Sequence, residues 1–509
     1  MRLQKRAGLV CLGVGLLALA LRLALLPVRP IPEPTVQDEF AYILGAETFC
    51  LGRVTNPPHP MWTHFEPFQE NSQPTYASKY PPAQSLFLAL GWKLFGHPWY
   101  GVWLSCGAMC AALCWMLQGW LPPRYALLGG LMAVAQWGIA GYWVNSYWGG
   151  AVAAAAGALV VGAVPRLARR PTAGVAALAA LGVVTLANSR PYEGAVTVVA
   201  AAGALWLWRR HAHRPFRGLL ARRVAAPAFA ILVCGLAAML YYNYRVTGNA
   251  LLMPYTLNQR TYGVVPVFWI LPLGPVPVYR YEVMRRLWVD YELSLYRPAR
   301  AWPPHVAILF VRTLWHFFLT TVSTLALLAA IFLRRGRKVG MALAIAGVAT
   351  AALLLEKYPN PHYFAPAMGL VLLLVLLGVQ YVRVQAGGLA MAAFTVLFFG
   401  TVALHACFIT GDEYPHRAFT AHRLSVIQRL EKDRLGSLSH LVIVRYAANH
   451  DPLEDWVFNH ADIDGSRIVW ARDMGAAGNR ELLDYYKGRK VWLLEADAPE
   501  PAPVPYGAQ

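Results

Sequence analysis

The chain has 509 residues, of which 57% are apolar and only 14% are charged. A soluble globular protein carries about 25% charged residues, so this composition excludes an ordinary soluble enzyme, and the apolar content excludes a disordered chain. Residues 1–408 hold 33 Lys and Arg against 11 Asp and Glu, whereas residues 409–509 hold 12 against 15. The basic part is therefore also the apolar part, which is typical of a polytopic membrane protein, and no nucleic-acid partner is expected.

Long apolar intervals predict the membrane helices, because a bilayer is crossed by roughly 17–25 apolar residues. The first interval follows a basic start, but its apolar core is long and Leu26-Pro27-Val28-Arg29-Pro30 is a poor signal-peptidase site. We therefore interpret it as a retained helix. The polytopic α-helical fold is predicted to contain eleven spans, near 8–27, 98–118, 124–140, 147–164, 173–188, 192–208, 224–242, 306–333, 339–355, 363–380 and 388–408.

The distribution of Lys and Arg predicts the orientation of these spans. The short loops on one side, near 141–146, 188–191 and 356–362, contain only two Lys or Arg residues, Arg190 and Lys357. The positive-inside rule then makes the N-terminus cytoplasmic, and eleven crossings place the C-terminus on the periplasmic or extracytoplasmic side of the inner (plasma) membrane. Eighteen Lys and Arg lie on the predicted cytoplasmic side, in the N-terminus and the loops near 119–125, 165–171, 209–223, 334–338 and 380–386.

Two long outer loops, 28–97 and 243–305, belong with the spans to a membrane domain of residues 1–408. The first loop contains amphipathic stretches near 37–51 and 83–96, which are too short to span and are predicted to lie in the interface. The second contains Val264–Val278, in which four prolines forbid a continuous helix and predict an interfacial or re-entrant loop.

Residues 409–509 change in composition and are predicted to form a small soluble α/β domain on the outer side. Strands are expected at 441–446, 467–472 and 491–496, which favours a small parallel sheet. Helices are expected near 452–460 and 476–486. No Gly-rich fingerprint follows the first strand, so a structural or recognition role is predicted.

The acidic residues of the membrane domain indicate where chemistry takes place. All eleven fall in predicted outer segments, and the predicted cytoplasmic loops contain none. Carboxylate chemistry is therefore expected at the outer face, and the proton-relay pattern of a coupled transporter is missing from the sequence. Asp38-Glu39 opens the first amphipathic stretch, where favourable interaction with the helix dipole is an alternative explanation.

An acidic pair after the first span, a long first outer loop that ends in Tyr80-Pro81-Pro82, and eleven spans with an outward soluble tail resemble the GT-C glycosyltransferases. The resemblance covers residues 8–408. It is closest to the polyprenyl-phosphate-sugar-dependent set, namely protein O-mannosyltransferases, the lipid A aminoarabinose transferase and RgtA/B/C/D-like enzymes. It implies a GT-C-like fold and an inverting transfer from a polyprenyl-phosphate-linked sugar donor to a hydroxyl of a glycan, lipid or protein acceptor.

The resemblance also implies site residues. Asp38 would be the general base, with Glu39 as the alternative, and the departing phosphate would need cations or hydrogen-bond donors. Ordinary explanations stay open: an Arg190–Glu193 pair closing a turn, a snorkelling Lys357, and an interfacial aromatic belt near Arg260. The candidate residues for binding the substrate and its lipid phosphate are Lys79, Tyr80, Arg190, Glu193, Arg260, Lys357 and His362.

No cofactor is expected. Asp38, Glu39 and Glu193 are the candidate ligands of a divalent cation, but no ligand spacing demonstrates such a site, and no metal is predicted. Two rival functions without covalent chemistry stay open: a lipid-linked glycan flippase, and an envelope-assembly scaffold whose tail binds a partner. A flippase should have polar residues along its path at both leaflets, whereas the acidic residues here are concentrated outside.

The Lys and Arg asymmetry predicts that the chain runs N-in and C-out. A reporter enzyme that works only outside the cytoplasm should therefore be active when it is fused after residue 509. A paired fusion with a reporter that works only in the cytoplasm is the control. Activity of the cytoplasmic reporter alone would contradict the predicted orientation.

Overall fold

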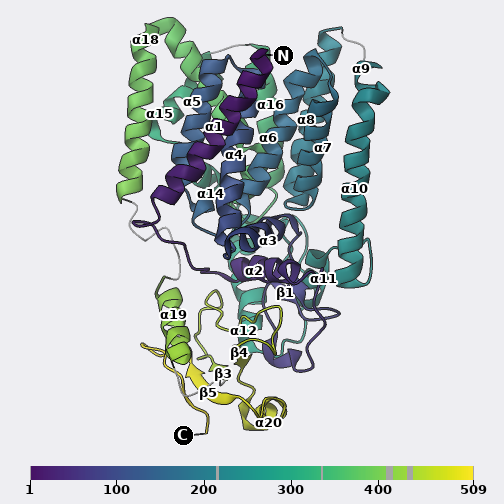
Figure 1. Cartoon of the computed structure of the whole chain (residues 1–509), viewed down its shortest axis with the longest axis vertical. Coiled ribbons are helices and arrows are strands. Elements are labelled where there is room, and N and C mark those ends of the chain that lie inside the picture. The colour runs from purple at the N-terminus through teal and green to yellow at the C-terminus, as the bar shows by residue number, and fades with distance from the viewer. Residues whose placement is uncertain (1, 214–216, 334–335, 409–416, 433–438, 508–509) are drawn as a thin grey trace.

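The structure is a computed structural model that describes residues 2–213, 217–333, 336–408, 417–432 and 439–507. A helical bundle forms one end of the molecule and a small sheet the other, and the two termini lie at these opposite ends (Figure 1). Arg214, Arg334 and Arg335 of the predicted cytoplasmic loops lie outside the described residues, as does the predicted domain boundary at residue 409.

Helices occupy each of the eleven intervals predicted to span the membrane. By length and composition, five helices of the described chain can cross a membrane, or six if a bent pair counts as one span. The chain is thus a membrane protein, while the number eleven and the orientation stay predictions. The bundle helices are α1 (Arg2–Ala24), α4 (Trp99–Trp120), α5 (Pro123–Ala133), α6 (Gly150–Arg169), α7 (Ala173–Ala187), α8 (Pro191–His211), α9 (Arg217–Leu220), α10 (Arg222–Thr247), α14 (Pro304–Phe318), α15 (Thr321–Leu328), α16 (Arg337–Leu353), α17 (Pro361–Phe364) and α18 (Met368–Phe408).

Two of these helices are bent for different reasons. Helix α18 consists of two arms joined at Gly387, whose φ of 80° is readily available only to glycine (Figure 1). Its two arms correspond to the separate spans predicted at 363–380 and 388–408. Helix α14 meets the helix that begins with α15 at 114°, and the capping Thr320 starts a new helix at this corner.

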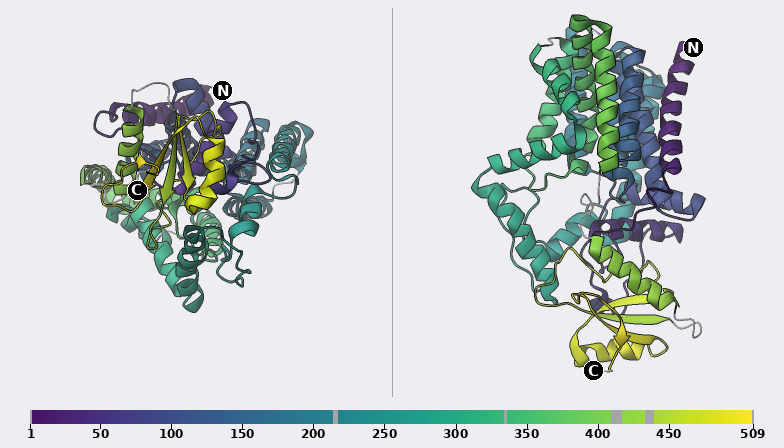
Figure 2. Two further views of the ribbon diagram at one scale, coloured as in Figure 1. Left: turned by 90° about the horizontal axis from the view of Figure 1, so that it is seen from below. Right: turned by 90° about the vertical axis from the view of Figure 1, so that its left-hand side faces the viewer.

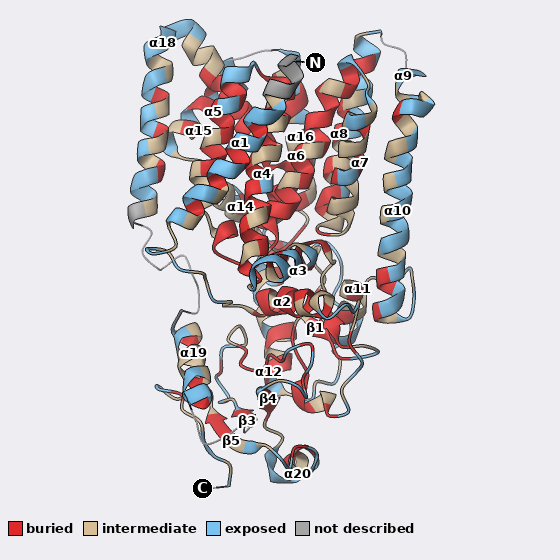
Figure 3. Ribbon diagram, in the orientation of Figure 1, coloured by how far each residue is buried: buried red, intermediate tan, exposed pale blue. Residues whose placement is uncertain are grey.

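The burial pattern agrees with a bundle in lipid. The inner helices are buried, whereas α10 stands at the edge with much of its apolar surface exposed, including Phe229, Leu232 and Leu236 (Figure 3). An apolar surface of this kind is stable in a bilayer and costly in water.

Two short helices lie across the end of the bundle that faces the sheet, between the bundle and the sheet (Figure 1). They are α2 (Gln37–Cys50) and α3 (Ala83–Phe95), and they match the two predicted interfacial stretches. Helix α3 crosses α4 at Gly91 and Gly101, where a Cβ on Gly91 would lie 1.9 Å from the Gly101 nitrogen. Small residues at this crossing therefore set how closely α3 approaches the bundle.

The second outer segment passes from the bundle towards the sheet (Figure 2). It contains α11 (Pro254–Tyr262), α12 (Glu282–Arg285) and α13 (Glu292–Ala301), the last two joined by a π-helical turn. Residues 264–278, all of which are described, contain no helix, as the four prolines predict. The backbone of this loop pairs instead with residues 355–357, since Trp269 N–H donates to Leu355 O at 3.1 Å and Lys357 N–H to Val267 O at 3.0 Å.

The tail contains a four-stranded sheet of order β4-β3-β5-β6. Strand β3 (His440–Arg445) is parallel to β4 (Ile468–Arg472) and β5 (Lys490–Glu495), and β6 (Val504–Pro505) is antiparallel to β5. Helix α19 (Arg417–Lys432) packs on one face, and α20 (Gly475–Tyr485) belongs to the core on the other. A separate two-stranded ribbon, β1 (Glu70–Asn71) and β2 (Ala77–Ser78), lies in the first outer loop.

The helix predicted near 452–460 is wrong. These residues are all described and form turns and extended chain, and residues 455–459 are buried one after another. A surface helix buries only one face, so five consecutive buried residues do not fit a surface helix, and here they form an extended segment that is covered on both sides. Helix α19 was not predicted, although Phe419, Val426 and Leu430 follow helical spacing and are buried.

Candidate functional site

A cavity of about 650 Å³ lies at the end of the bundle that faces the tail. Its wall includes the starts of α2 and α8, the Tyr-Pro-Pro segment before α3, helix α11, the turn between α12 and α13, and the turn before α17. Six of the nine side chains selected from the sequence line it together, namely Asp38, Lys79, Tyr80, Arg190, Glu193 and His362. Segments far apart in the chain therefore meet at one polar hollow.

Asp38 lies in the first turn of α2, where the positive end of the helix dipole favours a carboxylate. The Tyr80 hydroxyl donates a short hydrogen bond to Asp38 Oδ1. The Tyr80 ring in turn stacks on Tyr42, with the ring centroids 4.5 Å apart. The Tyr-Pro-Pro segment thus fixes the carboxylate at the cavity wall.

Glu39 is placed differently, although it is the next residue. Its Oε2 accepts hydrogen bonds from Thr35 N–H (2.7 Å), Thr35 Oγ1 (3.0 Å) and Val36 N–H (3.3 Å), and its Oε1 accepts one from Tyr147 N–H (2.8 Å). Burial raises the pKa of Glu39, against these hydrogen bonds. Glu39 does not line the cavity that Asp38 faces, and its contacts cap α2 and tie it to the loop before α6.

Lys79 places a buried ammonium group at the cavity. Its Nζ lies 4.9 Å from the Tyr255 ring centroid, 5.0 Å from that of Trp288 and 5.3 Å from that of Tyr80. Burial lowers its pKa to about 8, although Asp38 and Glu292 favour the charged form. At neutral pH the group is therefore mostly a cation, held by aromatic faces with little water around it.

Arg190 precedes α8, and its guanidinium lies 4.8 Å from the Tyr363 ring centroid. Among the described residues Arg190 and Glu193 form no close ion pair, although burial raises the pKa of Glu193 and the charge of the nearby Arg190 opposes this rise. Both residues line the cavity. The pair therefore offers polar groups to the cavity at its α8 end.

The other three candidates have different surroundings. Lys357 Nζ is buried and lies 2.6 Å from Glu292 Oε2, with further hydrogen bonds to Pro266 O and Val265 O. Arg260 is exposed on α11 and does not line the cavity. His362 lines it, but its Nδ1 is hydrogen-bonded to the Tyr142 hydroxyl at 2.7 Å.

Several residues at the cavity are not among the candidates predicted from the sequence. The Glu292 carboxylate forms an ion pair with Lys357 and accepts hydrogen bonds from the Tyr358 hydroxyl, and these contacts join α13 to the turn before α17. Trp288 and Glu356 also line the cavity. The sequence points to Glu292 and Glu356, because the acidic residues of the membrane domain all fall in the predicted outer segments. It contains no comparable pattern for Trp288. Among the described residues no group of three or more His, Cys, Asp and Glu is arranged to hold a metal ion.

The tail domain forms part of the cavity wall. Leu453 lines the cavity, and the Gln37 amide, adjacent to Asp38, donates to Pro452 O. Phe458 stacks on Phe40 of α2 at 4.7 Å between ring centroids. The extended segment between β3 and β4 therefore packs directly on the helix that carries Asp38.

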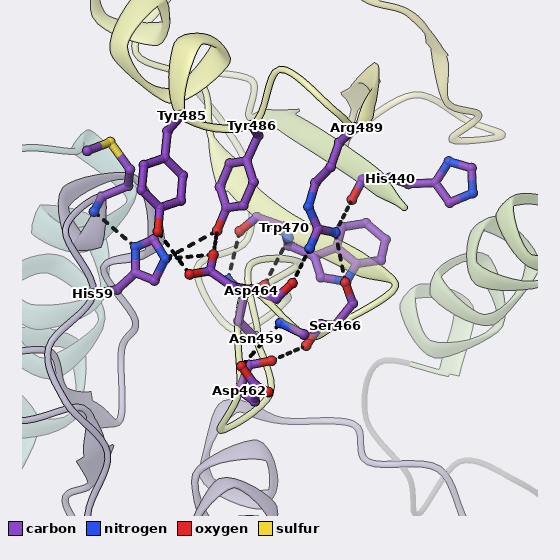
Figure 4. Close-up of polar contacts among 12 residues, drawn as sticks. His59, His440, Asn459, Asp462, Asp464, Ser466, Trp470, Tyr485, Tyr486 and Arg489 are labelled. Atoms are coloured by element: carbon purple, nitrogen blue, oxygen red, sulfur yellow. Dashed lines mark hydrogen bonds and ion pairs between the residues drawn. The ribbon is translucent and has the colours of Figure 1, made fainter. Parts of the chain in front are cut away.

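A polar cluster joins the tail to the first outer loop (Figure 4). Asp464 accepts hydrogen bonds from Tyr486 (2.6 Å), Tyr485 (2.9 Å) and His59 Nε2 (3.0 Å). Met61 N–H donates to His59 Nδ1, which leaves Nε2 as the donor. Although partial burial opposes it, these bonds lower the pKa of Asp464.

Comparisons with solved structures identify the fold. Neither a protein-family model nor a curated protein sequence matches the chain. The structure of ArnT from Cupriavidus metallidurans bound to undecaprenyl phosphate is similar over 96% of this chain and 91% of that one, with 13% identity and a TM-score of 0.53. The archaeal oligosaccharyltransferase AglB from Archaeoglobus fulgidus, in complex with an inhibitory peptide and a dolichol-phosphate, matches over 97% and 69%, with 12% identity and a TM-score of 0.47. The likeness to ArnT confirms the expected GT-C-like fold.

The polar cluster predicts how the tail is held. Asp464→Ala should leave three donors without their acceptor and weaken docking of the segment between β3 and β4 by about 1–2 kcal/mol, allowing for the partial exposure of Asp464. Hydrogen exchange of the amides at 446–461 in the full chain should become faster. Asp484→Ala, on the exposed side of α20, is the matched control. Unchanged exchange in Asp464→Ala would show that the cluster does not hold this segment.

Proposed function

We propose that this chain is an integral membrane glycosyltransferase that transfers a sugar, with inversion, from a polyprenyl-phosphate carrier to an acceptor hydroxyl at the outer face of the membrane. The observation that carries the proposal is that Asp38 and Lys79 line one cavity at the end of the helical bundle that faces the tail. The shared fold with ArnT, whose structure holds undecaprenyl phosphate, supports a lipid-phosphate donor.

Lys79 is the cation best suited to the donor phosphate. Among the described residues its buried ammonium makes cation–π contacts and no ion pair, whereas Lys357 forms an ion pair with Glu292. The Trp288 indole N–H is buried next to it, with no hydrogen-bond partner among the described residues. A cation and an N–H donor in a dry site stabilise the negative charge that develops on a departing phosphate.

Asp38 is suited to be the general base. Its carboxylate is oriented by Tyr80 and is exposed to the cavity. In the proposed step the acceptor oxygen bonds to the anomeric carbon while the bond from that carbon to the phosphate oxygen breaks. The acceptor proton passes to Asp38, and polyprenyl phosphate leaves with the electron pair. Attack opposite the leaving phosphate inverts the configuration.

The cavity walls favour transfer over hydrolysis. Leu453 and the aromatic side chains at the cavity keep bulk water away from the reacting groups. The tail lies on the outer side of α2, so an acceptor approaching from outside the membrane would pass beside it (Figure 1). The acceptor is a hydroxyl of a glycan, a lipid or a protein, and these three alternatives stay open.

Removing the base gives a direct test. Asp38→Asn keeps the size and the acceptor for Tyr80 but cannot take a proton, so transfer should fall by about 10²–10⁴-fold. Single-turnover transfer from a polyprenyl-phosphate sugar measures this, with thermal stability checked in parallel.

Two further variants make the test specific. Glu39→Gln should lower stability more than the rate, because Glu39 caps α2 and does not line the cavity. Glu282→Gln, exposed on α12, should leave both unchanged. Near-normal transfer by Asp38→Asn would remove Asp38 from the mechanism, and an absence of any sugar transfer in the wild type would favour the flippase or scaffold.

A further inference from the structure

The α8 end of the cavity contains buried polar atoms that no protein group satisfies. Both carboxyl oxygens of Glu356 are buried without a hydrogen-bond partner among the described residues, and the whole residue is only 2% exposed. Ser189 Oγ is also buried without a hydrogen-bond partner among the described residues, and both Ser189 and Glu356 line the cavity. Because unsatisfied buried polar groups are costly, such a group at a cavity wall points to a polar ligand.

The surroundings of Glu356 define the shape of this end. Its backbone is bridged to Phe268, and Phe268 packs edge-to-face on Tyr192 at 4.7 Å between ring centroids. Arg190 covers the Tyr363 ring, so aromatic faces alternate with polar groups along the wall. A sugar ring presents the same alternation, with apolar C–H faces and a rim of hydroxyls.

The titratable groups at this end lie close to Arg190. Arg190 and Glu193 both line the cavity, and burial raises the pKa of Glu193 while the charge of Arg190 acts against this rise. Burial raises the pKa of Glu356 to about 9, with Glu193 acting in the same direction and Arg190 against it. Glu356 is therefore a neutral carboxyl group at pH 7, able both to donate and to accept a hydrogen bond.

We propose that the α8 end of the cavity binds the sugar of the lipid-linked donor, and that Ser189, Glu193 and Glu356 select an uncharged sugar by hydrogen bonds to its hydroxyls. The inference rests on the proposed function and adds the class of the sugar. An amino sugar or a uronate would each bring a new ionised group into this buried end of the cavity, which is costly. A neutral sugar satisfies the buried atoms without burying a new charge.

The test uses the full chain in lipid nanodiscs and four probes. Three are polyprenyl-phosphate donors with one carrier and one anomeric configuration, bearing a neutral hexose, an amino hexose or a hexuronate. The fourth is bare polyprenyl phosphate. The neutral donor should bind at least about tenfold more tightly than either charged donor, because one unpaired buried group changes the binding free energy by an amount of this size.

Variants separate the sugar pocket from the phosphate site. Glu356→Ala should weaken binding of the neutral donor by about 10–100-fold while bare polyprenyl phosphate binds as before. Glu356→Gln should lose less than Glu356→Ala, because an amide both donates and accepts. Glu282→Ala, on the exposed surface of α12, is the control for expression and folding.

Two outcomes would overturn the inference. One is a charged donor that binds as tightly as the neutral donor or more tightly. The other is an equal loss of the neutral donor and of bare polyprenyl phosphate in Glu356→Ala. If neither polyprenyl phosphate nor any donor binds the wild type, the proposed function itself fails, which is a distinguishable result.

Discussion

The structure depends on how ionisable side chains are buried where the helical bundle meets the segments next to the tail. An isolated buried charge is costly, so each such group needs a partner or an aromatic face. Lys357 has Glu292, Asp38 has Tyr80, and Lys79 lies against Tyr255 and Trp288. These contacts join the start of α2, the Tyr-Pro-Pro segment, α13 and the turn before α17, and they leave a polar cavity between elements that are otherwise held by apolar packing.

The parts that depend on local pattern could be predicted from the sequence. Apolar length located the bundle helices, and amphipathic spacing with capping residues located α2 and α3. Asp38, Lys79 and Tyr80 are candidates from the sequence because they lie in the segment that follows the first predicted span, but only the structure shows that they line one cavity. Contacts between distant segments could not be predicted from the sequence, among them the ion pair between Lys357 and Glu292.

The tail shows a second limit of sequence interpretation. Residues 452–460 resemble a helix in composition, but they are covered by the sheet on one side and by α2 on the other. That environment exists only after the tail has docked. The same docking brings Leu453 to the cavity wall, so a segment with no chemistry of its own contributes to the site.

In the proposed function, the buried ammonium of Lys79 between Tyr255 and Trp288 binds the phosphate of a polyprenyl carrier. Binding of polyprenyl phosphate to the full chain, measured from pH 7 to 9, tests this directly, because the second phosphate pKa near 6 keeps the ligand charge constant over this range. Since the Lys79 pKa is about 8, the affinity should be high below that pH and fall by up to about tenfold per pH unit above it. Lys79→Arg, which stays charged, should remove this fall. A wild-type affinity that does not change across the range would contradict the assignment of Lys79.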